Sequence, residues 1–440
     1  MSSAELAAPS TDSATLDRLD SFVSPYTGIV RAAVGFLRAP HESAQESVGC
    51  SLADGEDVVG FALPRYTAGS HWEPGAARAA AIGEALERYS VAAFRPDNVL
   101  VGAARDLGPT AVAPSRFALF HELQHEHDEF RFTPFRDDTR LRWVPAYTLP
   151  GGEPALLPYQ LVSMQPPPQD EPVIAIPTSS GVACADSPDC AVLAGLLEVI
   201  ERDCFMLAWY NRLSLPRLDW SGDPVLTELD HRYFARTGLD YALVDASVFF
   251  DVPVLLGVVR GDGALGVGAG SAPSVGAAWR KALSEAFSVH RWLQDKLLEE
   301  PQRRPRARAE IRDFDDHVLF YADAERQRRT EFLDASTATS DVRTHRGLAG
   351  SDAPALIENL CARLAGRGAS AYVVDVTAPE VRKAGFAVAR VVSPELCSLD
   401  VLGWAPHLGG RRILHAAHEA GLVPAPLAFH ELNPDPHPFP

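Results

Sequence analysis

Two carboxylates one helical turn apart occur at two places in the chain. Glu198 and Glu201 lie in AVLAGLLEVIERDCFMLAWY, a run from residue 191 that is apolar on almost every side and contains no proline. At 3.6 residues per turn, this run predicts a buried helix about five turns long with both acids on one face. The segment GEALERYS repeats the pattern with Glu84 and Glu87, and an arginine follows the second glutamate in both segments.

The charge balance of these E-x-x-E-R segments indicates which kind of ligand they bind. A single such motif is usually an exposed helix face, where each i,i+4 pair contributes about 0.2–0.5 kcal/mol. The apolar helix around Glu198 leaves little solvated face, and an unpaired buried carboxylate is costly. If the two helices face each other, their four acids outnumber two arginines, and Mg²⁺ can balance them because it takes oxygen ligands and keeps waters for a phosphate. We therefore expect an Mg²⁺–nucleotide site formed by Glu84, Glu87, Glu198 and Glu201, with Arg88 and Arg202 facing the phosphates.

Long helices and buried strands must position these residues. Apolar periodicity predicts helices at residues 76–94, 188–212 and 275–298, and strand-like runs at 241–247, 252–259, 264–270, 370–377 and 386–394. Their irregular alternation indicates an α/β or α+β sheet protein, of which we take α/β with mixed sheets. GVGAG at residues 266–270 lacks the GxGxxG spacing and GxxxxGK[ST] is absent, so we interpret GVGAG as strand and turn.

The composition excludes several classes of protein. A chain of 440 residues with 46% hydrophobic content can bury a large core, and its net charge of −18 argues against nonspecific nucleic-acid binding. The first residues lack the basic and apolar regions of a signal peptide. The longest apolar tract is interrupted by Asp245, Asp251 and Pro253, which disfavours a membrane span. We expect a cytoplasmic protein that binds neither nucleic acid nor membrane.

Other polar clusters have simpler interpretations. The six cysteines show no CxxC spacing, which predicts reduced thiols. His121 and His125 in HELQHEHDEF could share a helix face and bind zinc, but a closed ligand set is not evident and we expect a solvated polar loop. The charged stretch at residues 303–317, RRPRARAEIRDFDDH, predicts a solvated surface excursion.

The order of the motifs resembles the YcaO family, specifically the azoline-forming cyclodehydratases of thiazole/oxazole-modified peptide biosynthesis. The matching segments are ARAAAIGEALERYS, WVPAYTL, TSSGVACADSPDCAVLAGLLEVIERDCFMLAWYNRL, AAWRKALSEAF and the C-terminal PHPFP. The resemblance implies a large YcaO-type domain in which E-x-x-E-R helices bind ATP through Mg²⁺. It implies attack of a Cys, Ser or Thr side chain on the preceding amide of a ribosomally made peptide, with ATP activating the amide oxygen, to give thiazoline or oxazoline rings.

The resemblance also assigns roles to individual residues. By this likeness Glu84, Glu87, Glu198 and Glu201 would ligate the metal. The residues that would bind ATP are Glu84, Glu87, Arg88, Asp186, Glu198, Glu201, Arg202, Lys281 and Glu285. The PxPxP tail, with Pro436, Pro438 and Pro440, would fold back towards the nucleotide and take part in catalysis. Three positions depart from the family pattern: Ala80 replaces the usual serine, Asp186 an asparagine and Cys190 an acid.

The expected organisation is a flexible N-terminal tail at residues 1–25, a YcaO domain at 26–430 and a proline-rich tail at 431–440. The resemblance implies a precursor peptide substrate, a separate leader-binding partner with a ubiquitin-activating-like fold, and a homodimer or complex; it leaves room for a dehydrogenase partner. Two alternatives stay open: a noncatalytic scaffold subunit, favoured by Ala80 and Cys190, and a YcaO enzyme that makes a thioamide or amidine.

Overall fold

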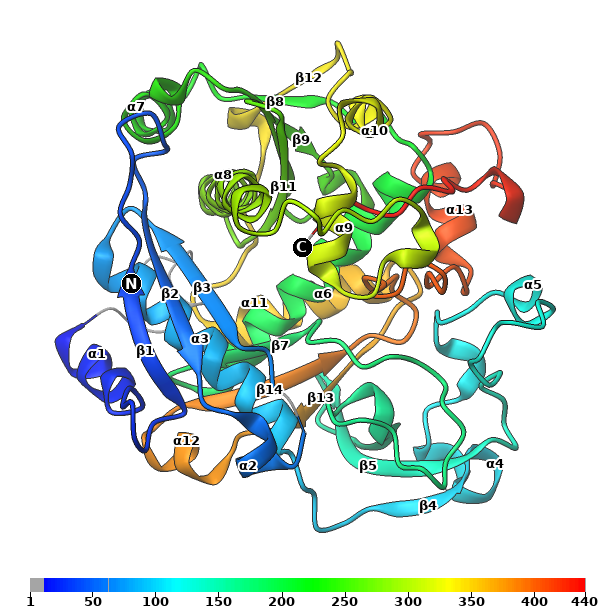
Figure 1. The fold of residues 1–440 in the computed structure, drawn as a ribbon. Coiled ribbons are helices and arrows are strands. Elements are labelled where there is room, and N and C mark those ends of the chain that lie inside the picture. Colours follow the sequence, from blue (N-terminus) through cyan, green and yellow to red (C-terminus); the bar gives the residue numbers. More distant parts are fainter. Residues whose placement is uncertain (1–11, 62, 440) are drawn as a thin grey trace. The chain divides into compact units, whose positions relative to one another are not determined.

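The computed structural model describes residues 12–61 and 63–439, which group into two compact units (Figure 1). Unit 1 consists of Met1–Leu37, Glu46–Val199 and Ala349–Leu396, and unit 2 of Arg38–Gln45, Ile200–Leu348 and Cys397–Pro440. The single domain expected over residues 26–430 therefore contains two compact units.

Unit 1 contains two antiparallel sheets among its described residues. The smaller sheet has the order β1-β2-β3, and the larger has the order β4-β5-β13-β14-β7 with β6 paired to β5. The strands are β1 Val30–Gly35, β2 Glu46–Leu52, β3 Tyr66–His71, β4 Leu100–Ala103, β5 Arg140–Leu149, β6 Pro154–Pro158, β7 Val182–Ala185, β13 Ala371–Asp375 and β14 Ala387–Val392.

The long helix α3, Pro74–Ala93, is the centre of unit 1. It begins at a proline, which suits the first turn of a helix, and its alanine-rich sequence has high helix propensity. α3 packs on the three-stranded sheet and also contacts β7 and β14, so its apolar side chains enter the main core of the unit. The other helices of unit 1 are α1 Ser13–Asp20, α2 Gly55–Val59, α4 Ala104–Leu107, α5 Glu122–His125, α11 Ala353–Ala365 and α12 Pro379–Lys383.

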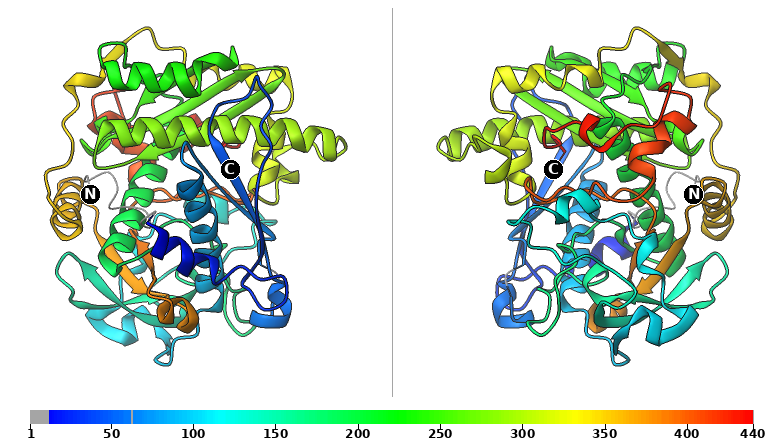
Figure 2. Two further views of the ribbon diagram at one scale, coloured as in Figure 1. Left: turned by 90° about the vertical axis from the view of Figure 1, so that its left-hand side faces the viewer. Right: turned by 90° about the vertical axis from the view of Figure 1, so that its right-hand side faces the viewer.

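Unit 2 is built on one sheet with the order β11-β10-β9-β8-β12. The sheet is mixed because β12 pairs with β8 in parallel, whereas its other pairs are antiparallel. Helix α8, Val275–Glu299, lies along one face of the sheet against β10 and β11 (Figure 2). The strands are β8 Arg217–Asp219, β9 Asp240–Asp245, β10 Val254–Gly261, β11 Ala264–Ser271 and β12 Thr339–Asp341, and the other helices are α7 Pro224–Tyr233, α9 Phe314–Phe320, α10 Ala324–Arg328 and α13 Arg412–Glu419.

Helix α6, Pro188–Tyr210, contributes its first half to unit 1 and its second half to unit 2. The Oγ of Ser187 accepts a hydrogen bond from the Cys190 N–H at 3.2 Å and so caps the first turn. Most of its side chains are buried, as the apolar sequence predicts.

The predicted α/β class with mixed sheets and long helices is confirmed, and the three long helices agree with their predicted ranges to within two residues at either end. Two predictions were wrong in part. The expected N-terminal tail, of which residues 1–11 lie outside the described residues, contains α1, because the Asp12 carboxylate caps this helix and Leu19 is buried in the core of unit 1. The stretch expected to be solvated contains the start of α9, where Asp316 and His317 are buried. No helix within the described residues is long and apolar enough to cross a membrane.

Candidate functional site

In unit 1, the side chain of Glu84 is held against strand β3 by a backbone N–H of that strand. The Ala68 N–H of β3 donates to Glu84 Oε2 at 3.2 Å, and Arg88 donates to Glu84 Oε1 at 3.0 Å. This contact requires β3 to approach α3 closely, and Gly69 makes that possible. A Cβ on Gly69 would lie 2.4 Å from the Ala77 carbonyl oxygen. The Glu84 carboxylate is therefore fixed in place by strand and helix together.

One turn further along α3, Glu87 is buried close to a second acid. Its Oε1 accepts the N–H of Cys184 in β7 at 2.9 Å. Burial, followed by the nearby charge of Glu198, raises the pKa of Glu87 to about 8, although the Cys184 N–H and Arg88 act in the opposite direction. Two neighbouring carboxylates favour a bound cation.

The residues that depart from the family pattern lie near these acids in unit 1. Ala80 presents an exposed methyl group one turn before Glu84. Asp186 follows β7 and is half-buried, and its charge adds to the raised pKa of the Cys190 thiol, of which burial is the main cause. Asp186 therefore keeps an oxygen ligand at this place, whereas Cys190 is a neutral thiol rather than a second acid.

Unit 2 holds a second acidic group, on α6 and α8. The Ser271 N–H donates to Glu201 Oε2 at 2.5 Å, and Lys281 Nζ lies 2.8 Å from the same oxygen. The Ala269 N–H donates to Glu285 Oε2 at 2.7 Å. Burial, followed by the nearby charge of Glu201, raises the pKa of Glu285 to about 7, although Lys281 acts in the opposite direction. This group combines two acids with a lysine that is partly open to solvent.

The two acidic groups are constructed alike, which the sequence analysis missed. Ala68 and Ala269 each begin an Ala-Gly-Ser strand segment, and each donates its N–H to a glutamate sixteen residues later. The glycines also match: a Cβ on Gly270 would lie 2.3 Å from the Ala278 carbonyl oxygen, eight residues on, as Ala77 is from Gly69. The shared Ala-Gly-Ser and the spacing to glutamate were the available signal. They place Lys281 at the position in unit 2 that Ala80 occupies in unit 1.

Arg202 and the C-terminal tail lie in unit 2. Arg202 is half-buried, and its charge counteracts the raised pKa of Glu285 and lowers the pKa of His437 in the tail. Pro436 and Pro438 are buried, as is His437 between them. Pro440, the last of the three predicted catalytic prolines, lies outside the described residues.

Two other features differ in role from the acidic groups. Asp203, the residue after Arg202, is fully buried and accepts hydrogen bonds from Arg412 at 2.6 and 3.1 Å and from the Cys397 N–H at 2.8 Å. It is a structural acid that sequence reasoning did not single out. In HELQHEHDEF, His121 caps α5 through its ring nitrogen, and His125 packs against Phe130. All six cysteines are buried free thiols.

Comparison with known proteins identifies the family. The model described as YcaO cyclodehydratase, ATP- and Mg²⁺-binding, matches residues 68–397. A comparison with curated proteins found no match. Three solved structures share the fold. A heterocyclase in complex with substrate and cofactor is 20% identical with a TM-score of 0.78, and the match covers 96% of this chain and 57% of that one. YcaO from Methanopyrus kandleri, bound with AMPPCP and Mg²⁺, is 20% identical with a TM-score of 0.62 over 87% and 90% of the two chains.

The third structure is the E. coli microcin synthetase McbBCD complex with pro-MccB17 bound, 14% identical with a TM-score of 0.57 over 92% of this chain and 99% of that one. This chain spans little more than half the length of the heterocyclase. The family match covers most of the sequence and includes both E-x-x-E-R segments. This chain therefore belongs to the YcaO family of ATP- and Mg²⁺-binding cyclodehydratases.

Proposed function

We propose that this protein is an ATP- and Mg²⁺-dependent cyclodehydratase that converts Cys, Ser or Thr residues of a ribosomally made precursor peptide to thiazoline or oxazoline rings. The observation that carries the proposal is the anchoring of the acids. Glu84, Glu87, Glu201 and Glu285 each accept a backbone N–H through one carboxylate oxygen. Such anchoring aims each carboxylate before a ligand arrives, which favours catalysis by positioning and charge.

The donor set of the chain fits Mg²⁺ and a nucleotide. Carboxylate oxygens are the ligands that Mg²⁺ prefers, and we assign Glu84, Glu87, Glu198 and Glu201 to this role. Arg88, Arg202 and Lys281 supply positive charge for phosphate oxygens, and Asp186 and Glu285 supply further hydrogen-bond acceptors. Helix α6 carries Glu198 in the part that belongs to unit 1 and Glu201 three residues later in the part that belongs to unit 2.

The proposed chemistry needs little from the protein beyond placement. Bound ATP would supply the phosphoryl group that turns the amide oxygen of the peptide into a phosphate leaving group. The peptide's own thiol or hydroxyl attacks the preceding carbonyl carbon and loses its proton. As the oxygen leaves with the phosphate, the amide nitrogen loses its proton and becomes the imine nitrogen of the ring. The acids would hold the metal, and the cationic side chains would neutralise charge on the transferring group. The net change is loss of one water per ring and hydrolysis of one ATP.

We also propose that a separate protein binds the leader segment of the precursor. The support is that the microcin synthetase, which shares the fold, was solved as a complex of several proteins with the peptide pro-MccB17. A leader-binding partner of ubiquitin-activating-like fold and a homodimeric or larger complex are the arrangements we expect.

A second candidate function is that of a noncatalytic subunit. It is favoured by the exposed methyl of Ala80 and by Cys190, a neutral thiol where the family usually has an acid. A YcaO enzyme that makes a thioamide or amidine is a further alternative, which the PHPFP tail disfavours by its resemblance to the azoline-forming branch.

The substitution Glu201→Gln tests the proposal. Gln keeps the acceptor for the Ser271 N–H but removes the charge, and Lys281, partly exposed, can turn to solvent, so folding survives. With precursor and partner supplied, mass spectrometry of the peptide should show the loss of one water per ring with wild type and no loss with the variant. Glu171→Gln is the matched control, because the Glu171 side chain is also buried and forms an ion pair with Arg142 at 2.7 Å. Wild type that removes no water and releases no phosphate under these conditions would favour the noncatalytic subunit.

A further inference from the structure

The C-terminal segment, residues 433–439, is packed into unit 2 rather than lying on its surface. A proline has no N–H but keeps its carbonyl group, so the tail can still accept hydrogen bonds through its backbone. Trp209 Nε1 donates to the Asp435 carbonyl oxygen at 3.0 Å, and the Tyr321 hydroxyl donates to the Pro436 carbonyl oxygen. The Asn433 N–H donates to the Tyr210 carbonyl at 2.8 Å. Residues 436–439 are all buried. The tail is therefore held along its length by unit 2.

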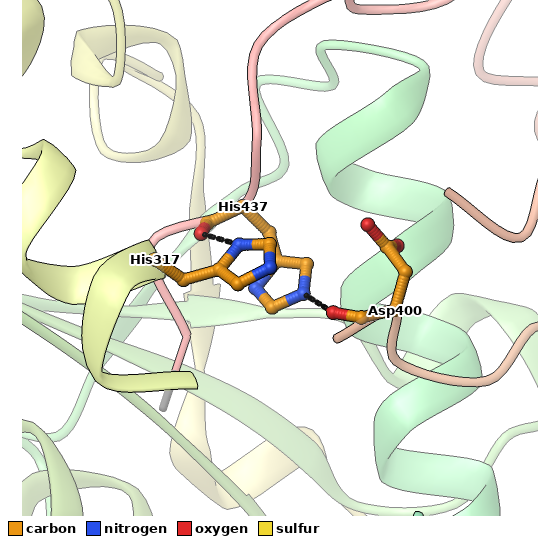
Figure 3. A group of neighbouring side chains, drawn as sticks. All are labelled: His317, Asp400 and His437. Atoms are coloured by element: carbon orange, nitrogen blue, oxygen red, sulfur yellow. Dashed lines mark hydrogen bonds between the residues drawn. The ribbon is translucent and has the colours of Figure 1, made fainter. Parts of the chain in front are cut away.

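The two residues between the prolines each pack on aromatic rings of unit 2, and the Phe205 ring contacts both, with its centroid 6.0 Å from that of His437. The His437 ring stacks on His317 of α9, with ring centroids 4.0 Å apart and planes 10° from parallel (Figure 3). His317 Nδ1 lies 3.0 Å from the His437 carbonyl oxygen, so ring and backbone of one tail residue meet the same partner. Two residues on, the Phe439 ring packs on Phe205 of α6 with centroids 4.8 Å apart. The two tail residues thus differ in their main partner: His437 stacks on His317, which we call the polar socket, and Phe439 packs most closely on Phe205, which we call the apolar socket.

The histidine stack also defines the state of its rings. The Phe439 N–H donates to His437 Nδ1 at 3.3 Å, so Nε2 carries the proton and donates to the Asp400 carbonyl oxygen at 2.9 Å. Burial lowers the pKa of His437 to about 4 and that of His317 to about 3. These lowered pKa values favour neutral rings, which stack without charge repulsion, and a neutral His317 donates to one of the two carbonyl oxygens, of His437 and Val401, that face its nitrogens.

The same residues do not form a metal centre. His317, His437 and Asp400 lie within ligand distance of one another. A histidine binds a metal through a lone pair in the plane of its ring, and the lone pairs of two nearly parallel stacked rings do not meet at one point. The ring nitrogens of both histidines already face protein partners. The cluster is therefore better explained by its contact with the tail.

The sockets can determine the register of the tail, that is, which tail residue occupies which position along unit 2. The pattern P-x-P-x-P repeats every two residues, so the prolines alone fit equally well after a slip of two. In an extended proline-rich chain such a slip displaces all following residues by about 6 Å. It would also bring Phe439 to the stacked polar socket of His317 and leave the Phe205 socket without its ring. The unlike pair His437 and Phe439 therefore distinguishes the two registers.

We propose that His317 and Phe205 are positioning residues that set the register of the proline tail by receiving His437 and Phe439. This inference deepens the proposed function and rests on it for its catalytic consequence, because only a tail held in one register presents its end to the reaction consistently. The socket itself stands on the contacts of unit 2 alone.

Hydrogen-exchange mass spectrometry of the full chain tests the socket independently of activity. His317→Leu removes the stack and the polar contact, and His437→Phe makes the tail PFPFP while keeping all prolines. In both variants the backbone amides of residues 435, 437 and 439, which unlike the prolines between them carry an N–H, should exchange at least about tenfold faster than in wild type. His290→Leu is the matched control: His290 is also a buried histidine of unit 2, bound to the Gly261 carbonyl at 3.0 Å and not to the tail.

Activity supplies the second readout. Ring formation per enzyme should fall at least about tenfold in His317→Leu and His437→Phe, while affinity for Mg²⁺–AMPPCP stays within about twofold of wild type. The double variant should be no slower than the single ones if His317 acts through His437. Unchanged exchange, or full activity of His437→Phe, would overturn the proposal. If wild type forms no rings, the proposed function fails and faster exchange still supports the socket. If His317→Leu does not fold, His437→Phe decides, because it leaves α9 intact.

Discussion

Adding one methyl group at Gly69 should loosen the contact that aims Glu84. In Gly69→Ala the new Cβ would lie 2.4 Å from the Ala77 carbonyl oxygen and 2.5 Å from the Ala81 nitrogen. Ordinary contacts of this kind begin at 3.4 Å. Because both opposing atoms belong to the backbone of α3, no side chain can move aside. Strand β3 must therefore move away from α3 by about 1 Å, the difference between these distances.

The cost follows from two effects of that movement. Overpacking of a close backbone contact costs about 1–3 kcal/mol. The hydrogen bond from the Ala68 N–H to Glu84, already 3.2 Å long, would lengthen beyond hydrogen-bond distance, and a bond to a charged group contributes about 1.5–3 kcal/mol, at the low end here because it is partly exposed. We expect the free energy of unfolding to fall by about 2.5–4.5 kcal/mol, out of about 5–15 kcal/mol for a typical protein.

Urea unfolding followed by tryptophan fluorescence measures the loss, and titration with Mg²⁺–AMPPCP measures its effect on the acids. Gly35→Ala is the matched control, because Gly35 lies in the same sheet and a Cβ there meets nothing within 4 Å. The control should change the free energy of unfolding by no more than about 0.5 kcal/mol and leave nucleotide affinity unchanged. If Gly69→Ala is no less stable than Gly35→Ala, or binds the nucleotide as tightly as wild type, the close approach does not position Glu84.

Three further outcomes are expected. Arg412→Leu should lower the free energy of unfolding, measured in urea, by about 3–5 kcal/mol, because it leaves the buried Asp203 carboxylate without its cation. The control Arg411→Leu, which removes an exposed ion pair with Glu419, should lower it by less than about 1 kcal/mol. Equal losses in the two variants would refute the importance of the buried pair. The hydrogen bond to Asp245 raises the pKa of His345 above 6.5, so this pair should stabilise the fold below pH 6.5 and lose that contribution as the pH rises through the folded pKa; the stability gap between wild type and His345→Gln should shrink over that range, and a constant gap would contradict it. Deleting residues 436–440 should abolish ring formation and, because His437 and Phe439 are buried, should also lower the melting temperature of the chain; normal ring formation by the truncated chain would show that the tail has no part in catalysis.

The three long helices could be predicted from the sequence, and so could the presence of acids on buried helix faces, because both depend on local residue patterns. An apolar run without proline, such as the one around Glu198, predicts a buried helix wherever it lies in the fold. The GVGAG strand was also interpreted correctly as strand rather than phosphate loop, and the structure adds the reason for its glycines. A Cβ on Gly268 would lie 2.5 Å from the Ala286 nitrogen, so the glycines let α8 approach the sheet.

Features that depend on distant partners could not be predicted in the same way. The charged stretch around His317 was expected to be solvated, but Arg303 pairs with Asp316 and turns this part of the chain inwards. Asp203 was not distinguished from its acidic neighbours, because its partner Arg412 is 209 residues away. The proline tail was recognised in the sequence, yet a proline pattern alone does not reveal which surface receives it.

The fate of one oxygen atom tests the central claim most directly. A precursor peptide carrying heavy oxygen at the carbonyl before the reacting Cys, Ser or Thr is incubated with wild-type protein, partner, ATP and Mg²⁺, and the released phosphate is analysed by mass spectrometry. Because the amide oxygen is proposed to leave as phosphate, the account predicts one labelled phosphate for each ring formed, and none with Glu201→Gln. Rings formed while the label appears in water, or phosphate released without label, would contradict activation of the amide oxygen by ATP.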